Sequence, residues 1–145
     1  STSLNFRKIL SRDAFLENGY YYTKMTEYLK KANNNSPSPK KKLIGWKLVE
    51  NLRYGENPHQ GASVYSLNKE INIKQLNGKK LSYNNYNDIF TGISLSKSFT
   101  KDYSTVIIKH ANPCGVALDK RKINSYLKAY ECYPTSTFGG IISCN

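Results

Sequence analysis

The sequence has 145 residues, enough for one ordinary domain with a hydrophobic core. It carries 22 lysines and arginines against 10 aspartates and glutamates, a formal net charge of +12 that favours anionic partners. Its apolar runs are too short to span a bilayer and its first residues lack the order of a secretion signal, so we expect a soluble, cytoplasmic protein without a membrane partner.

The first part of the sequence, residues 1–32, predicts two short helices. Apolar residues recur at loosely helical spacing on both sides of Asn18-Gly19, a pair that often separates two helices. Two short amphipathic helices cannot bury their apolar faces alone, so we expect them to pack on chain that is either downstream or missing. Because the sequence has no initiator Met and opens directly into a helix, we expect the second and interpret the sequence as a fragment.

Residues 33–42 have the composition of a solvated linker. The run is polar, contains two prolines and ends in three lysines. We place a domain boundary there, between residues 1–32 and residues 43–145.

Alternating apolar residues after the linker predict three strands. They lie at residues 43–49, 61–67 and 71–76, and Asn68-Lys69 is expected to form the turn between the last two. Residues 84–88 then offer several side chains that can cap a helix, whose inward side chains would be Ile89, Phe90 and Ile93.

The second half of the sequence predicts an α/β fold. The β-branched run at residues 106–108 is typical of a strand covered on both faces, and a helical stripe follows at residues 123–130. Residues 138–143 predict another strand. Strand, helix and strand in succession are typical of a βαβ unit, so we expect a parallel or mixed sheet with flanking helices.

Lys109 and His110 follow the buried strand, at the position where ligands of open α/β sheets bind. We expect Asn112-Pro113 to end the strand pairing and turn the chain. Adjacent strand residues point to opposite faces, so these two side chains can share a substrate only if the backbone has left the strand. A neutral imidazole can remove a proton near pH 7 and an ammonium can stabilise a developing negative charge. An ordinary strand end is the alternative interpretation.

A second candidate site lies at residues 52–60. Gly55 and a following Asn-Pro pair force a turn from which Arg53, Tyr54 and His59 project. An arginine can hold a phosphate or carboxylate with its planar fork of donors. The alternative is an ordinary loop in which Arg53 pairs with Glu56.

The remaining signals are weaker. Residues 78–85 and 135–140 could present backbone amides to an anion, but neither has a dinucleotide-binding or phosphate-loop spacing. The three cysteines, Cys114, Cys132 and Cys144, lack zinc-site spacing, so we expect no metal and reduced thiols. Cys114 near His110 suggests a nucleophile and base, although no third group would orient them.

Four strings in this order resemble a known family. They are Leu-Arg-Tyr-Gly-Glu-Asn-Pro-His-Gln from Leu52, Gly-Lys-Lys-Leu-Ser-Tyr-Asn-Asn-Tyr-Asn-Asp from Gly78, Val-Ile-Ile-Lys-His-Ala-Asn-Pro-Cys-Gly from Val106, and Thr-Phe-Gly-Gly-Ile-Ile from Thr137. Together they closely resemble the bifunctional purine biosynthesis enzymes that combine AICAR transformylase with IMP cyclohydrolase. The resemblance is dense over residues 43–145 and looser over residues 1–32.

The resemblance implies a fold and a reaction. The second part would be the N-terminal part of a cytidine-deaminase-like transformylase domain, preceded by two helices from the end of the cyclohydrolase domain. The implied reaction transfers a formyl group from the co-substrate 10-formyltetrahydrofolate to AICAR, and the full-length protein then closes the ring to give IMP.

The resemblance also implies residue roles. By matching position, His110 accepts the proton and Lys109 stabilises the charged intermediate or protonates the departing folate nitrogen. Arg53 and Tyr54 hold the nucleotide. Further substrate-binding residues implied in the same way are Asn84 and Gly139, which line the pocket, and His59, which assists.

Two features are at odds with this assignment. In a parallel βαβ unit Gly139 would lie at the end of the sheet opposite Lys109, and a site built from two subunits of a homodimer is one way to reconcile them. Tyr133 also stands where the family usually has an aspartate.

Residues needed for both reactions are expected outside this sequence, so we expect this stretch alone to catalyse neither. A basic nucleic-acid-binding module and an inactive interaction fragment are the alternatives. Because the lysines are scattered and do not follow a binding motif, we expect no nucleic acid partner.

Overall fold

The computed structural model describes residues 2–33, 40–67 and 71–145. The contacts between residues divide the chain into two compact units. The first comprises Ser1–Val49 and Tyr65–Asn72, and the second comprises Glu50–Val64 and Ile73–Asn145. The predicted division into residues 1–32, 33–42 and 43–145 stays a prediction, and most of the predicted linker, residues 34–39, lies outside the described residues. None of the described helices is long and apolar enough to cross a membrane.

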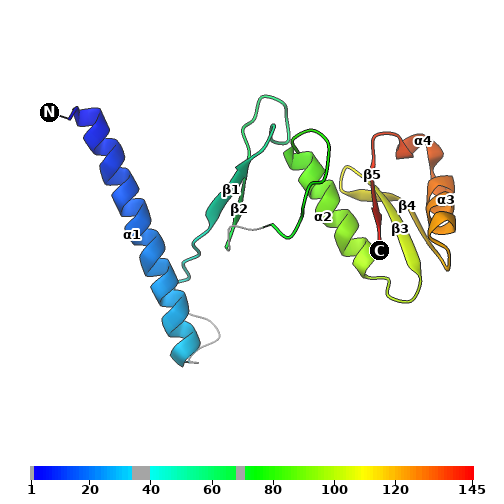
Figure 1. The fold of residues 1–145 in the computed structure, drawn as a ribbon, viewed down its shortest axis with the longest axis horizontal. Helices are drawn as coiled ribbons and strands as arrows, with labels where there is room; N and C mark the ends of the chain where they lie inside the picture. The colour runs from blue at the N-terminus through cyan, green and yellow to red at the C-terminus, as the bar shows by residue number, and fades with distance from the viewer. Residues whose placement is uncertain (1, 34–39, 68–70) are drawn as a thin grey trace. The chain divides into compact units, whose positions relative to one another are not determined.

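Figure 1 shows the elements in chain order. They are α1 (Leu4–Asn33), β1 (Lys47–Asn51), β2 (Ser63–Ser66), α2 (Tyr83–Lys97), β3 (Tyr103–Lys109), β4 (Asn112–Asp119), α3 (Lys122–Cys132), α4 (Pro134–Thr137) and β5 (Ile141–Cys144).

The two helices predicted before residue 33 are one continuous helix, α1. Gly19 lies inside it, and its carbonyl oxygen accepts a hydrogen bond from Thr23 Oγ1 at 2.8 Å. A glycine in a helix interior costs about 1 kcal/mol relative to alanine, which weakens a helix without ending it. The predicted break at Asn18-Gly19 is therefore wrong.

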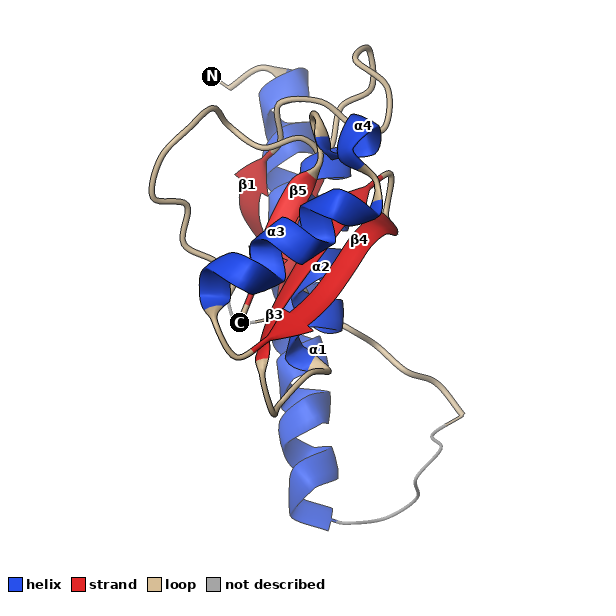
Figure 2. Cartoon of the chain, turned by 90° about the vertical axis from the view of Figure 1, so that its right-hand side faces the viewer, coloured by secondary structure: helices blue, strands red, loops and turns tan. Residues whose placement is uncertain are grey.

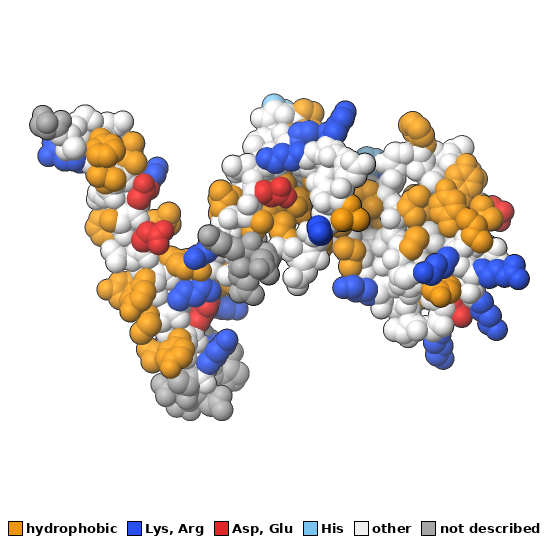
Figure 3. All heavy atoms as spheres, viewed as in Figure 1, with side chains coloured by type: hydrophobic (Ala, Val, Ile, Leu, Met, Phe, Trp, Pro, Cys, Tyr) orange, Lys and Arg blue, Asp and Glu red, His pale blue; other side chains and the backbone are white. Residues whose placement is uncertain are grey.

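Most large apolar side chains of α1 are exposed, and Figure 3 shows them along the helix. They are Leu4, Phe6, Ile9, Leu10, Phe15, Leu16, Tyr21, Tyr22, Met25, Tyr28 and Leu29. Within its own unit α1 is contacted near Tyr20, whose ring centroid lies 4.8 Å from Lys47 Nζ.

The strands predicted after the linker are shorter in the structure, and one is absent. β1 and β2 pair as a two-stranded sheet. β1 begins later than predicted, and β2 is shorter than predicted at both ends. The strand predicted at residues 71–76 does not form, and the predicted turn at Asn68-Lys69 lies outside the described residues. Gln75 Nε2 instead donates to the carbonyl oxygens of Asn77 at 3.1 Å and Lys79 at 2.9 Å, so its side chain bonds locally within residues 75–79.

The predicted helix near residue 84 is confirmed as α2, with its cap two residues earlier than predicted. Ser82 Oγ accepts from the backbone nitrogen of Asn85, and Asn85 Oδ1 accepts from that of Ser82, a capping box. Phe90, predicted to point inward, is 50% exposed, while Tyr86 is buried. The buried side of α2 is therefore rotated from the predicted one.

The main sheet has three strands in the order β4-β3-β5, and both pairings are antiparallel. The α/β fold with flanking helices is confirmed, but the predicted parallel or mixed pairing is wrong. The missing feature is β4, which was not predicted as a strand and reverses the chain before α3. As a result, β4 and β5 run in the same direction, and both are antiparallel to β3.

β3 and β4 are joined directly by a tight hairpin. Lys109 pairs with Asn112, so only two residues form the loop. The prediction that Asn112-Pro113 ends the pairing is wrong, because Pro113 lies in the edge strand β4, opposite Ile108 and beside a register shift. Edge strands and bulges tolerate proline because the missing donor is not needed there.

The sheet lies between α2 and α3, as Figures 1 and 2 show from two directions. Ser104 Oγ donates to the carbonyl oxygen of Ser96 in α2, and the Thr105 hydroxyl is hydrogen-bonded to that of Ser125 in α3. Successive β3 side chains thus face opposite helices. Val106, Ile107 and Ile108 have no exposed surface, which confirms the prediction of a strand buried on both faces.

Candidate active site

The predicted site residues all belong to the second unit. They are Arg53, Tyr54, His59, Asn84, Lys109, His110 and Gly139. Within that unit α2 is the element that connects the loop at residues 52–60 to the β3–β4 hairpin.

The loop at residues 52–60 is fixed to the start of α2 by its backbone. Arg53 N donates to the carbonyl oxygen of Leu81 at 3.0 Å, and Tyr83 N donates to that of Tyr54 at 3.1 Å. Asn84 Nδ2 adds a third link by donating to the carbonyl oxygen of Glu56 at 3.0 Å. Asn84 therefore holds the loop, besides its predicted place in the pocket.

A partly buried hydrogen bond fixes the segment that leads into this loop. The Tyr86 hydroxyl, on α2, donates to Glu50 Oε1 at the end of β1. Burial of Tyr86, followed by this bond and the negative charge of Glu50, raises the pKa of Tyr86 from 10.0 to about 12. The pair stays intact at neutral pH and ties β1 to α2.

Arg53 and Tyr54 form a cationic and aromatic pair. Arg53 Nη2 donates to Tyr54 Oη at 3.0 Å, and the guanidinium carbon lies 4.7 Å from the ring centroid. The alternative interpretation, a pair between Arg53 and Glu56, is not seen among the ion pairs of the described residues. The exposed guanidinium keeps its charge available for an anionic group.

His59 lies in the exposed turn of the same loop. It is exposed in a turn where Asn57 N donates to Gln60 Oε1 at 2.9 Å and Gln60 N donates to the carbonyl oxygen of Asn57 at 3.0 Å. Across the described part of the chain, no hydrogen bond joins His59 to another predicted site residue. A hollow of about 440 Å³ lies beside this loop, lined by Gly55, Glu56, Gln60, Gly61, Ala62 and Tyr83.

Lys109 and Gly139 lie at the same end of the sheet. Ile141 pairs with Ile108 because β5 is antiparallel to β3, so the residues before β5 approach the end of β3. Lys109 Nζ donates to the carbonyl oxygen of Phe138 at 3.2 Å. The predicted placement of Gly139 at the opposite end is therefore wrong, since it assumed parallel strands, and a second subunit is not needed to bring the two together.

His110 has left the strand, as a shared site with Lys109 requires. His110 and Ala111 have φ values of +52° and +56°, a left-handed conformation in which a residue other than glycine is strained by about 1–2 kcal/mol. Two-residue hairpin loops use this conformation at both positions, and usually contain asparagine or glycine. Strained residues of this kind cluster at functional sites.

Two side chains hold this turn in place. Asn112 Nδ2 donates to the carbonyl oxygen of His110 at 2.8 Å, and Asp88 Oδ1 accepts from Ala111 N at 2.6 Å. Asp88 was not predicted as a site residue. Its signal in the sequence is its position four residues after Asn84, on the same face of a helix.

The other candidate chemistries are less supported. Cys114 Sγ donates to the carbonyl oxygen of Ile107 at 3.4 Å, a contact to the backbone and not to His110. In the ranges that the structure describes, no three His, Cys, Asp or Glu side chains are grouped so that they could hold a metal ion.

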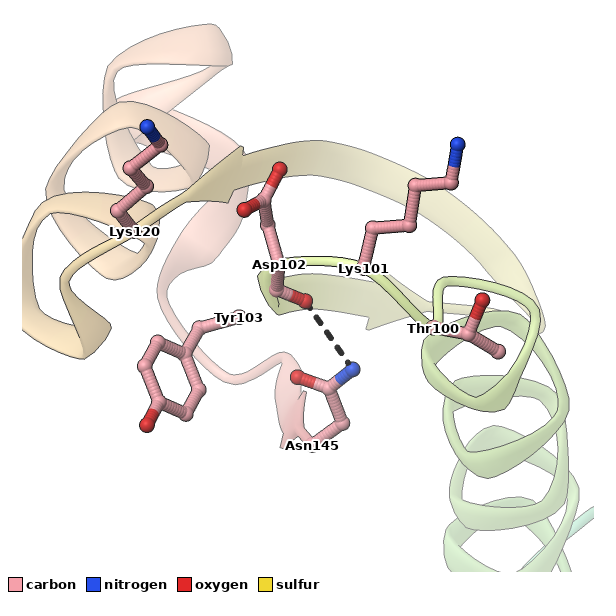
Figure 4. Close-up of a pocket in the computed structure, with 6 residues that line it drawn as sticks. All are labelled: Thr100, Lys101, Asp102, Tyr103, Lys120 and Asn145. Carbon is pink, nitrogen blue, oxygen red and sulfur yellow. Dashed lines mark hydrogen bonds between the residues drawn. The ribbon is translucent and has the colours of Figure 1, made fainter.

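A larger hollow of about 610 Å³ lies at the other end of β3 (Figure 4). It is lined by Thr100, Lys101, Asp102, Tyr103, Lys120 and Asn145, and Asn145 Nδ2 donates to the carbonyl oxygen of Asp102 at 3.4 Å. None of the predicted site residues lines it. Lys109 and His110, the two predicted catalytic residues, lie at the opposite end of the strand.

Comparisons with known proteins agree with the motifs. The family model described as AICARFT/IMPCHase bienzyme matches residues 1–145. The chain is 40% identical over 151 residues to a protein of Acetivibrio thermocellus and 39% identical over 150 residues to one of Listeria welshimeri, both named bifunctional purine biosynthesis protein PurH. These matches cover 99% and 100% of this chain but 29% of each relative. The chain thus spans under a third of the length of these relatives.

Proposed function

Starting from the premise that the chain belongs to the AICARFT/IMPCHase bienzyme family, we propose that it forms part of an AICAR formyltransferase. The reaction moves a formyl group from 10-formyltetrahydrofolate to the 5-amino group of AICAR. In the full-length protein, ring closure of the product to IMP follows on the cyclohydrolase part, whose last residues would be 1–32.

The observation that supports this proposal most directly is the arrangement of Lys109 and His110. The backbone leaves β3 after Lys109 and turns at His110, while the Lys109 ammonium lies against Phe138 beside Gly139. One side chain that can accept a proton and one cation that can stabilise negative charge thus follow each other at the end of a rigid, buried strand.

The proposed chemistry assigns one step to each group. The AICAR amine is a poor nucleophile because its lone pair is drawn into the imidazole and carboxamide. His110 removes a proton from it as its nitrogen attacks the formyl carbon, and the carbonyl oxygen becomes negatively charged. Lys109 stabilises that charge. The bond from the formyl carbon to the folate nitrogen then breaks, and that nitrogen takes up a proton from Lys109 or from the protonated His110.

The proposed binding roles are those that the resemblance to the family implies. Arg53 offers a planar fork of donors to the nucleotide phosphate, and Tyr54 offers a ring face and a hydroxyl. Asn84 and Gly139 line the nucleotide pocket, and His59 assists from the exposed turn. The protein would work in the cytoplasm as a homodimer.

The test uses the full-length protein that contains this chain. His110→Ala should lower the formyl-transfer rate by about 10²- to 10⁴-fold, the usual contribution of a positioned general base. Cyclohydrolase turnover on the formylated product should stay within about twofold of wild type, because those residues lie elsewhere.

The second histidine provides a matched comparison. His59→Ala should lower formyl transfer by less than about tenfold, since His59 assists and does not accept the reacting proton. A His110→Ala enzyme that retains formyl transfer at the wild-type rate would contradict the proposal, as would a wild-type protein that binds AICAR without transferring the formyl group.

A further inference from the structure

Asp88 makes a contact that ties α2 to the turn at His110. Its Oδ1 accepts a hydrogen bond from Ala111 N at 2.6 Å, across a sequence separation of 23 residues. The side chain is half-buried, and among the ion pairs of the described residues none involves it. The carboxylate therefore interacts with the turn and not with a cation.

The turn needs such support because of its sequence. Lys109 pairs with Asn112, which leaves His110 and Ala111 as the whole loop, both with positive φ and neither a glycine. The Asn112 amide holds the carbonyl oxygen of His110, and Asp88 holds the nitrogen of Ala111. These two atoms belong to the same peptide group, the one that follows His110. Fixing that peptide group fixes the backbone from which the imidazole projects.

We propose that Asp88 is a positioning residue for His110 in formyl transfer. The inference rests on the proposed function, in which His110 accepts the proton of the AICAR amine. Asp88 does not contact the substrate; it sets the ψ angle at His110 through the Ala111 nitrogen. Without it, the peptide group can rotate toward a less strained conformation, and the imidazole moves away from the amine.

The same helix also sets where the nucleotide lies. Asn84 and Asp88 are four residues apart on α2, and they hold the carbonyl oxygen of Glu56 and the nitrogen of Ala111 respectively. One turn of a capped helix thus connects the loop of Arg53 to the turn of His110. Asp88 makes the second half of this connection.

The experiment measures kcat and KM for AICAR in the full-length enzyme. Asp88→Ala should lower kcat by about 10- to 100-fold, because a displacement near 1 Å of a reacting group costs rates of that order. KM for AICAR should stay within about threefold of wild type, since the groups that bind the nucleotide are untouched. Asp88→Asn should recover kcat to within about threefold, because its amide oxygen still accepts from Ala111 N.

Asp88→Glu keeps the charge but displaces the acceptor by one methylene, so it should lower kcat by at least about fivefold. If Asp88→Ala does not fold, the kcat of Asp88→Glu tests the inference instead. Ile107→Val, which trims a buried side chain of the same strand as Lys109, is the control for lost stability and should leave kcat near wild type.

Wild-type kcat in Asp88→Ala, or in Asp88→Glu if the alanine variant is unfolded, would overturn the inference. So would an equal loss in Asp88→Asn and Asp88→Ala. A failure of the proposed function looks different, because then His110→Ala itself retains formyl transfer, whatever Asp88 does.

Discussion

The ammonium of Lys109 donates a hydrogen bond to the carbonyl oxygen of Phe138 across 3.2 Å, and so joins the last residue of β3 to the loop that leads into β5. The two residues are 29 positions apart in the sequence. Their contact exists because β5 is antiparallel to β3. This pairing brings the cation, the turn of His110 and Gly139, with its φ of +77°, to one end of the sheet.

Arg53 is expected to bind the nucleotide through the shape of its guanidinium as well as its charge. Arg53→Lys keeps the charge but removes the planar fork and the stacking on Tyr54. We expect KM for AICAR to rise about tenfold, equivalent to about 1.4 kcal/mol, with kcat within about twofold of wild type. Steady-state kinetics of the full-length enzyme measure both. Arg121→Lys, an exposed arginine at the start of α3, is the matched control, and an equal KM in the two variants would refute the role of Arg53.

Ala111 carries strain that glycine would relieve. At its φ of +56°, Ala111→Gly should remove about 1–2 kcal/mol of strain and add about 0.4–1 kcal/mol of entropy to the unfolded chain. The net result is a gain in unfolding free energy of up to about 1.6 kcal/mol, measurable by urea denaturation. Ala117→Gly, in the regular part of β4, should instead destabilise by roughly 0.5–1 kcal/mol. Equal destabilisation by both substitutions would mean that the turn is not strained.

Gly115 allows α3 to approach β4 closely. A Cβ atom at Gly115 would lie 2.1 Å from the carbonyl oxygen of Ala129, a backbone atom that cannot move without shifting the helix. Gly115→Ala should therefore lower the unfolding free energy by about 3 kcal/mol, at the upper end of overpacking effects. Gly61→Ala is the control, since no atom lies within 4 Å of its Cβ position, and it should change stability by less than about 1 kcal/mol. Similar melting curves for the two variants would rule out this packing.

The raised pKa of Tyr86 predicts that the protein loses stability in alkaline solution. This pKa is raised from 10.0 to about 12 by burial, and then by the bond of Tyr86 to Glu50. Below pH 10 the hydroxyl is protonated in both folded and unfolded chains, so the contribution of Tyr86 to the unfolding free energy is fully present. As the pH rises from about 10 to about 12 the unfolded chain loses this proton first, and stability should fall by on the order of 2 kcal/mol.

The measurement is the unfolding free energy at several values of pH. Tyr86→Phe should remove this part of the alkaline decline, and Glu50→Gln should reduce it by removing the negative charge. A decline in Tyr86→Phe as steep as in the wild type would show that other groups cause it.

The sequence by itself predicted the family of this chain and parts of its local structure. A run of three β-branched residues at Val106 predicted a strand buried on both faces, and the structure confirms it. The motifs also predicted Lys109 and His110 as site residues. The backbone does leave the strand directly after Lys109, at His110. These features could be predicted because the apolar pattern of a strand and the residues of a turn are local signals in the sequence.

Only the tertiary structure decided the strand direction, and with it the geometry of the site. A buried strand has the same apolar pattern whether its neighbours are parallel or antiparallel, so the residues around Val106 cannot report which segment pairs with them. Pairing with β4 and β5 placed Gly139 beside Lys109, and packing of α2 on the sheet brought Asp88 to Ala111. The Ala111–Asp88 and Lys109–Phe138 contacts join residues 23 and 29 positions apart, and they depend on how distant elements pack. The periodicity of apolar residues within one segment does not predict that packing.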